Sequence, residues 1–191
     1  MAAFFKNMKI ILASASPRRK ELLKQVVEEF DIIPAKGEER ADLTLPPEKI
    51  VCALAEHKCG EVFEKYPDCV VIGCDTIVYF NGKTLGKPKT RAEAEETLKE
   101  LSGKPHSVYT GVCVRAADKI ITKYERTEVI FNKLSAEFIK NYVDGGSPMD
   151  KAGCYGIQDK GVVKSYDGSY TNVVGLPVEL VEKMLKEFKI N

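Results

Sequence analysis

Residues 8–23, MKIILASASPRRKELL, contain a strand, a short polar loop and a helix in immediate succession. The run at 8–13 is short and apolar, which indicates a buried strand. Ser16 suits the N-cap of a helix, and Pro17 suits its first position. The apolar residues that follow fit a helical period: Leu22, Leu23, Val26 and Val27. This strand–loop–helix unit favours an α/β fold.

Strands and helices continue to alternate along the rest of the chain. The predicted segments are strands at 30–34, 70–72 and 76–80, paired strands at 107–115 and 119–131, an Asn81-Gly82 hairpin turn, and helices at 45–65, between Thr90 and Gly103, at 135–143 and at 177–188. An irregular glycine-rich stretch is predicted from 145 to 168. Because hairpins interrupt the alternation, we expect an α/β fold with a mixed β-sheet and flanking helices. No repeat or linker divides the sequence, so residues 1–191 are interpreted as a single domain.

The composition is that of an ordinary globular protein. Hydrophobic residues make up 44% of the chain and charged residues 30%, and the formal net charge is +1. With so little net charge, no overall field attracts nucleic acid or an acidic membrane, so any anion site must be local. The six cysteines form no C-x-x-C pair and only two histidines accompany them, which argues against a structural zinc site. Reduced cysteines in apolar runs favour a cytoplasmic location.

The N-terminal stretch resembles a secretion signal only superficially. It has an early lysine and an A-x-A-like Ala13-Ser14-Ala15, but the uncharged run after Lys9 is too short for a signal peptide. No apolar segment reaches the length needed to span a bilayer, so no membrane partner is expected.

The loop at 14–20, SASPRRK, places three cations in the first turn of the predicted helix. Positive charge at a helix N-terminus is unfavourable by about 0.3–1 kcal/mol per charge, and a bound anion would reverse that sign. Free backbone amides, two serine hydroxyls and a bidentate arginine together favour a phosphate cradle, and its candidate substrate-binding residues are Ser14, Arg18 and Arg19. The alternative is the solvated basic start of a surface helix.

A single carboxylate, Asp75, interrupts the apolar run VVIGCDTIVYF at 70–80. A buried carboxylate is costly unless it is paired or metal-bound, so we favour a functional group, either a metal ligand or a general base toward water. The alternative is an aspartate at a strand end that accepts hydrogen bonds from a turn.

Other polar residues give weaker signals on their own. Lys87 precedes Pro88 after the predicted hairpin, Glu39 lies in a charged loop, and Lys58 borders the apolar face of a helix. Each has an ordinary interpretation as a solvated or snorkelling charge. In the stretch at 150–158, DKAGCYGIQ, Lys151 suits a phosphate and the Gln158 amide suits a base edge, although the pattern is also typical of a plain loop.

These stretches in this order resemble the Maf family of nucleotide pyrophosphatases. The matching pieces are LASASPRRKELL, GCDTIV, NGKTLGKP, LSGKPHSVYTGV, PMDKAGCYGIQ and NVVGLP, which span residues 12–177. The resemblance implies an elongated α/β fold with two lobes around a central cleft, similar to inosine triphosphate pyrophosphatases. It also implies hydrolysis between the α and β phosphates with a divalent cation, Mg²⁺ or Mn²⁺.

The resemblance also assigns roles by position. Asp75 matches the proton acceptor, and Asp75 with Glu39 supplies the carboxylates for metal or base chemistry. The conserved polar cluster of the family is matched by Ser14, Arg19, Glu39, Lys58 and Lys87. Arg18, Thr76 and Gln158 match the specificity positions of the branch that resembles dTTP/UTP pyrophosphatases. Lys151 adds a cation for the triphosphate.

The sequence therefore predicts a hydrolase that converts dTTP and UTP, or modified pyrimidine nucleotides, to the monophosphate and pyrophosphate. The alternative is a non-catalytic nucleotide-binding regulator of cell division, against which the intact Asp75, Glu39 and Lys87 argue. Nucleic-acid binding is disfavoured because the basic loop lacks aromatic platforms. The expected partner is the nucleotide, and a homodimer is left open.

Overall fold

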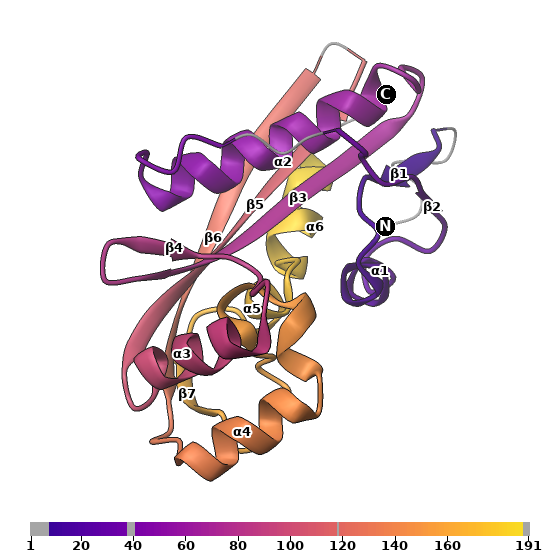
Figure 1. Ribbon diagram of the computed structural model, residues 1–191. Coiled ribbons are helices and arrows are strands. Elements are labelled where there is room, and N and C mark those ends of the chain that lie inside the picture. Colours follow the sequence, from indigo (N-terminus) through magenta and orange to yellow (C-terminus); the bar gives the residue numbers. More distant parts are fainter. Residues whose placement is uncertain (1–7, 38–40, 118, 189–191) are drawn as a thin grey trace. The chain divides into compact units, whose positions relative to one another are not determined.

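A computed structural model of the chain describes residues 8–37, 41–117 and 119–188 (Figure 1). The helices are α1 (Pro17–Leu23), α2 (Pro47–Phe63), α3 (Arg91–Leu101), α4 (Ala136–Asp144), α5 (Tyr170–Val174) and α6 (Val178–Glu187). The strands are β1 (Ile10–Leu12), β2 (Asp31–Ile32), β3 (Val70–Phe80), β4 (Lys83–Leu85), β5 (Pro105–Ala116), β6 (Lys119–Phe131) and β7 (Val163–Asp167). Two short 3-10 helices, Ser147–Asp150 and Ala152–Cys154, lie between α4 and β7.

The strands form one mixed sheet in the order β2-β1-β3-β5-β6-β7, and β4 pairs with β3. β1 is parallel to β2 and to β3, whereas β4 and β7 are antiparallel to β3 and β6. The prediction of an α/β fold with a mixed sheet and flanking helices is therefore confirmed.

The last third of the chain differs from the prediction. The stretch from 145 to 168, expected to be irregular, ends in β7 and is followed by α5. Four of the five β7 residues are exposed, so the strand carries no alternation of apolar and polar residues that could have revealed it. β2 is also shorter than the strand predicted at 30–34, because only Asp31 and Ile32 pair with β1.

The chain divides into two compact units, and each is described by itself. The first contains residues 1–75, 110–125 and 175–191, and the second contains residues 76–109 and 126–174. The boundary falls inside β3, so Asp75 belongs to the first unit and Thr76 to the second. That residues 1–191 form one domain around a central cleft stays a prediction.

In the first unit, α2 packs directly on β3 and β5 (Figure 1). A Cβ atom on Gly73 would lie 2.4 Å from the Ala55 carbonyl oxygen, and one on Gly111 would lie 2.2 Å from that of Val51. These two glycines thus let the helix backbone approach the strands. The core around this contact consists of Ile11, Ala13, Ala55, Cys59, Val62, Phe63, Val71 and Cys113.

In the second unit, α3 and α4 pack together over a separate apolar core. His106 belongs to this core, with its Nε2 atom 2.8 Å from the Tyr155 hydroxyl and its ring edge-on to Phe131. Burial lowers the pKa of His106 to about 4, so the imidazole is neutral near pH 7. The histidine is a packed core residue. No helix among the residues described is both long and apolar enough to cross a bilayer.

Candidate active site

The central feature of the first unit is an ion pair between Asp75 and Lys58. Asp75 lies inside β3 and Lys58 on α2, and the Lys58 Nζ atom is 2.5 Å from Asp75 Oδ1. Each side chain is only 12% exposed. The predicted burial of a carboxylate in this strand is confirmed, and the carboxylate is stabilised by a cation that comes from a neighbouring helix.

The local geometry explains why Lys58 reaches Asp75. Alternate residues of a strand face the same side, so Gly73 and Asp75 share one face of β3. Gly73 lies against Ala55 and Cys59, which flank Lys58 on α2. The absence of a side chain at position 73 therefore brings the helix close enough for the Lys58 ammonium to contact the carboxylate two residues further along the strand.

A second cation, Arg19, connects the β1–α1 loop to the same strand. Its Nε donates to the Gly175 carbonyl oxygen at 2.8 Å, and its Nη1 donates to the Cys74 carbonyl oxygen at 3.1 Å and to Ser14 Oγ at 3.3 Å. The predicted cradle residues Ser14 and Arg19 are thus brought to the residue that precedes Asp75. Ser16 caps α1 as predicted, since its Oγ accepts from the Arg19 amide at 3.5 Å.

The remaining groups of the first unit have simpler positions. Arg18 lies half-buried at the start of α1. Cys74 is buried, and burial raises the pKa of its thiol, although the Arg19 and Lys58 charges oppose that shift. A protonated buried thiol packs and does not act as a nucleophile. Glu39, the second predicted carboxylate, lies outside the described residues.

The second unit holds the other predicted residues. Thr76 is half-buried in β3, and Lys87 is exposed between β4 and α3. The Lys151 ammonium lies 2.5 Å from the Ser147 carbonyl oxygen, 3.2 Å from Ser147 Oγ and 2.8 Å from Asp150 Oδ1. The Gly153 amide donates to the Gly86 carbonyl oxygen at 3.2 Å, which brings the loop of Lys87 beside the segment that follows Lys151.

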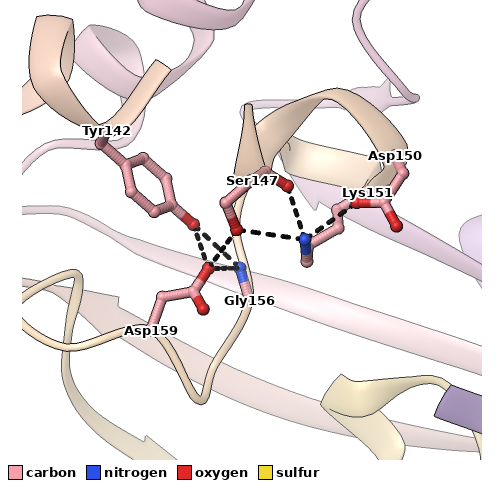
Figure 2. Close-up of polar contacts among 6 residues, drawn as sticks. All are labelled: Tyr142, Ser147, Asp150, Lys151, Gly156 and Asp159. Atoms are coloured by element: carbon pink, nitrogen blue, oxygen red, sulfur yellow. Dashed lines mark hydrogen bonds and ion pairs between the residues drawn. The ribbon is translucent and has the colours of Figure 1, made fainter. Parts of the chain in front are cut away.

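Gln158 is exposed in a short turn. The sequence did not predict the residues that hold this turn. Asp159 Oδ2 accepts hydrogen bonds from the Tyr142 hydroxyl, from Ser147 Oγ at 2.9 Å and from the Gly156 amide at 3.2 Å (Figure 2). Burial first, and then the hydrogen bond to Asp159, raises the pKa of the Tyr142 hydroxyl. The phenol therefore stays a proton donor near neutral pH.

The structure therefore brings the predicted residues together in two sets, one in each unit. In the first unit Ser14, Arg19, Lys58 and Asp75 surround one segment of β3. In the second unit the segments of Lys87 and Lys151 are hydrogen-bonded neighbours, and Lys151 and the turn of Gln158 share contacts through Ser147. The roles assigned to these residues from the sequence stay predictions.

Comparison with known proteins places these sites in a family context. The sequence matches the family described as Maf-like protein over residues 9–188. It is 50% identical over 185 residues to a dTTP/UTP pyrophosphatase of Bacillus anthracis, covering 96% of this chain and 97% of that protein. It is 49% identical over 188 residues to a dTTP/UTP pyrophosphatase of Bacillus cereus (strain ATCC 10987 / NRS 248), covering 97% and 93%.

Two solved structures share the fold at low sequence identity. The HAM1 protein of Coxiella burnetii is similar with a TM-score of 0.55 at 12% identity, covering 94% of this chain and 99% of that one. The Ham1 protein of Staphylococcus aureus is similar with a TM-score of 0.52 at 13% identity, covering 94% and 98%. At such identities the likeness concerns the fold alone.

Proposed function

Because the chain belongs to the family of Maf-like proteins, we propose that it hydrolyses dTTP and UTP to the nucleoside monophosphate and pyrophosphate. The two Bacillus relatives named above carry this activity in their names and align over nearly the whole chain. The observation that carries the proposal is the nearly buried Asp75–Lys58 pair, whose two side chains are each 12% exposed. A charged pair this deep is costly, which favours a chemical role.

We assign the proton transfer to Asp75. Water attacks the α-phosphorus and loses its proton to the carboxylate, the bond to the bridging oxygen breaks, and pyrophosphate leaves. Lys58 holds Asp75 Oδ1, so we assign the basic atom to Oδ2. Arg19 fixes the backbone beside this carboxylate by donating to the Cys74 carbonyl oxygen, and Ser14 Oγ accepts from the same guanidinium group. A group that accepts a proton in the transition state contributes about 10²–10⁴-fold to the rate.

Other residues supply charge and selectivity in this proposal. Lys87, Lys151 and Arg18 provide cations for a triphosphate, whose negative charge shifts onto the leaving pyrophosphate. The Gln158 amide donates to and accepts from the edge of a pyrimidine, and Thr76 and Arg18 are further specificity residues.

A divalent cation, Mg²⁺ or Mn²⁺, fits the donor chemistry of these residues. Asp75 offers carboxylate oxygen, the donor that hard cations prefer, and Glu39 is the second carboxylate we assign to the ion. Within the described residues, no three His, Cys, Asp or Glu side chains group to hold an ion. Mg²⁺ commonly binds one or two carboxylates together with substrate phosphates and water. When bound, the ion would polarise phosphoryl oxygens.

Removal of the metal is expected to lower the rate of pyrophosphate release from UTP at least about tenfold. The measurement compares the purified protein before and after dialysis against EDTA, and then after Mg²⁺ or Mn²⁺ is restored. Zn²⁺ serves as a control ion. It is also divalent, and sites select between divalent ions more by coordination geometry than by affinity. Full activity after exhaustive chelation would exclude the metal-assisted mechanism.

Replacement of Gln158 by alanine is expected to lower the preference for UTP and dTTP over CTP about tenfold. Alanine can neither donate to nor accept from a base edge, and the loss of such a contact weakens discrimination. The measurement is kcat/KM for UTP, dTTP, CTP and GTP in both proteins. A wild-type enzyme without preference contradicts the proposed substrates, whereas an equal loss on all substrates contradicts only the role of Gln158.

A second function, a non-catalytic nucleotide-binding regulator of cell division, remains the alternative. Binding of UTP without release of pyrophosphate would favour it. We further propose a cytoplasmic location, which the free thiols of Cys52, Cys59, Cys69, Cys74, Cys113 and Cys154 support. A homodimer stays a prediction.

A further inference from the structure

The turn that carries Gln158 spans residues 156–159 and is closed by a backbone hydrogen bond. The Asp159 amide donates to the Gly156 carbonyl oxygen at 3.0 Å, which closes the turn. The Gln158 side chain folds back over Gly156. This is shown by the position of its Nε2 atom, which would lie 2.5 Å from a Cβ atom at position 156. The direction of the Gln158 amide therefore depends on the conformation of residues 156–159.

Three donors converge on one oxygen of this turn. Asp159 Oδ2 accepts from the Tyr142 hydroxyl on α4, from Ser147 Oγ and from the Gly156 amide (Figure 2). The Gly156 amide also lies 3.3 Å from the Tyr142 hydroxyl oxygen, so it is shared between tyrosine and aspartate. Hydrogen bonds to a carboxylate are stronger than those between neutral groups. The turn is thus tied to α4 by its own aspartate.

The same network of hydrogen bonds extends to Lys151, another predicted substrate-binding residue of the second unit. Ser147 donates to Asp159, and its carbonyl and hydroxyl oxygens both contact the Lys151 ammonium. One hydrogen-bond network therefore joins Lys151 to the turn that carries Gln158, and Tyr142 and Asp159 are its anchors. We call these two residues the turn clamp.

We propose that the turn clamp, Tyr142 and Asp159, sets the base preference of the enzyme by positioning Gln158. Neither side chain reads the nucleotide itself, so both are positioning residues. The proposal rests on the proposed function of Gln158. A purely structural role for the clamp would lower stability and would slow all nucleotides equally, whereas a positioning role changes the ratio between nucleotides.

The experiment uses Tyr142→Phe, which removes the hydroxyl and keeps the ring that packs against Phe138. The ratio of kcat/KM for dTTP to that for CTP is expected to fall about fivefold, in line with the loss of one hydrogen bond. Tyr166→Phe is the matched control, because Tyr166 is 47% exposed on β7 and its change is expected to leave the ratio unaltered. Asp159→Asn is expected to act in the same direction as Tyr142→Phe.

A double variant separates positioning from general damage. If Tyr142 acts through Gln158, then Tyr142→Phe no longer changes the ratio in a Gln158→Ala background, because coupled residues are not additive. An unchanged ratio in the single variant, or the same change in both backgrounds, overturns the proposal.

Amide hydrogen exchange gives a readout that does not depend on catalysis. Exchange at Gly156 and Asp159 is expected to be faster in Tyr142→Phe than in the wild type, and unchanged in Tyr166→Phe. Unchanged exchange in Tyr142→Phe shows that the clamp does not hold the turn and overturns the proposal. A wild-type protein that releases no pyrophosphate from dTTP instead contradicts the proposed function, and exchange then still decides whether the clamp exists.

Discussion

Asp75→Asn is expected to lower kcat for UTP and dTTP at least about a hundredfold, because a general base contributes about 10²–10⁴-fold. The change is nearly isosteric, but the amide cannot accept the proton of the attacking water. The measurement is steady-state pyrophosphate release, with the fold checked by circular dichroism. A variant that keeps more than about a tenth of wild-type kcat contradicts the assignment of Asp75 as the base.

The structure adds a second consequence of the same change. Asp75→Asn leaves the Lys58 ammonium, whose side chain is 12% exposed, without its carboxylate partner. Removal of one member of a buried pair commonly costs about 3–5 kcal/mol, so we expect a lower midpoint in urea even though the fold persists. A loss of rate could then reflect a disturbed site as well as a missing base.

A double variant distinguishes these two causes. Lys58→Gln combined with Asp75→Asn replaces the ion pair by two neutral amides, which can hydrogen-bond to one another. We expect the double variant to regain part of the lost stability and to stay as inactive as Asp75→Asn alone. If kcat returns with stability, the single variant was slow because the ion pair was broken and the site was disturbed, and Asp75 is not the base.

The parts of the site that depend on local pattern could be predicted from the sequence. The strand and helix at 8–23 and the Ser16 cap follow from apolar spacing and capping chemistry, and both are present. Asp75 stood out because a carboxylate inside an apolar strand must have a partner. The identity of that partner could not be derived, since Lys58 is 17 residues away and its register on the sheet depends on helix packing.

The parts that depend on distant, polar contacts were not predicted. Tyr142 and Asp159 are 17 residues apart, on a helix and in a turn, and neither belongs to a motif that suggests contact. Strand β7 is almost entirely exposed, so hydrophobic periodicity gives no signal there. The contact between Tyr142 and Asp159 forms only when α4 and the turn pack together. Neither element has a sequence motif that indicates this packing.

Gly73→Ala is expected to destabilise the protein by about 3 kcal/mol, at the upper end of the usual cost of overpacking. The new Cβ atom would lie 2.4 Å from the Ala55 carbonyl oxygen and 2.7 Å from the Cys59 amide nitrogen. Both atoms belong to the backbone of α2, so no side-chain rotation can relieve the overlap. Either α2 moves away from β3 or the strand bends.

The matched control for this prediction is a glycine on α2, the helix that Gly73 of β3 contacts. A Cβ atom on Gly60 of α2 would have Arg115 Nη1 at 4.0 Å as its nearest neighbour, so Gly60→Ala should be neutral or stabilise the helix by up to about 1 kcal/mol. Urea unfolding measures both variants, and the slope should stay unchanged while the midpoint shifts. Because Ala55 and Cys59 flank Lys58, the displaced helix should also carry the ammonium away from Asp75 and slow pyrophosphate release per folded molecule. A Gly73→Ala protein as stable as Gly60→Ala would mean that α2 does not rest on β3 through this glycine, and the contact between Lys58 and Asp75 would then need another support.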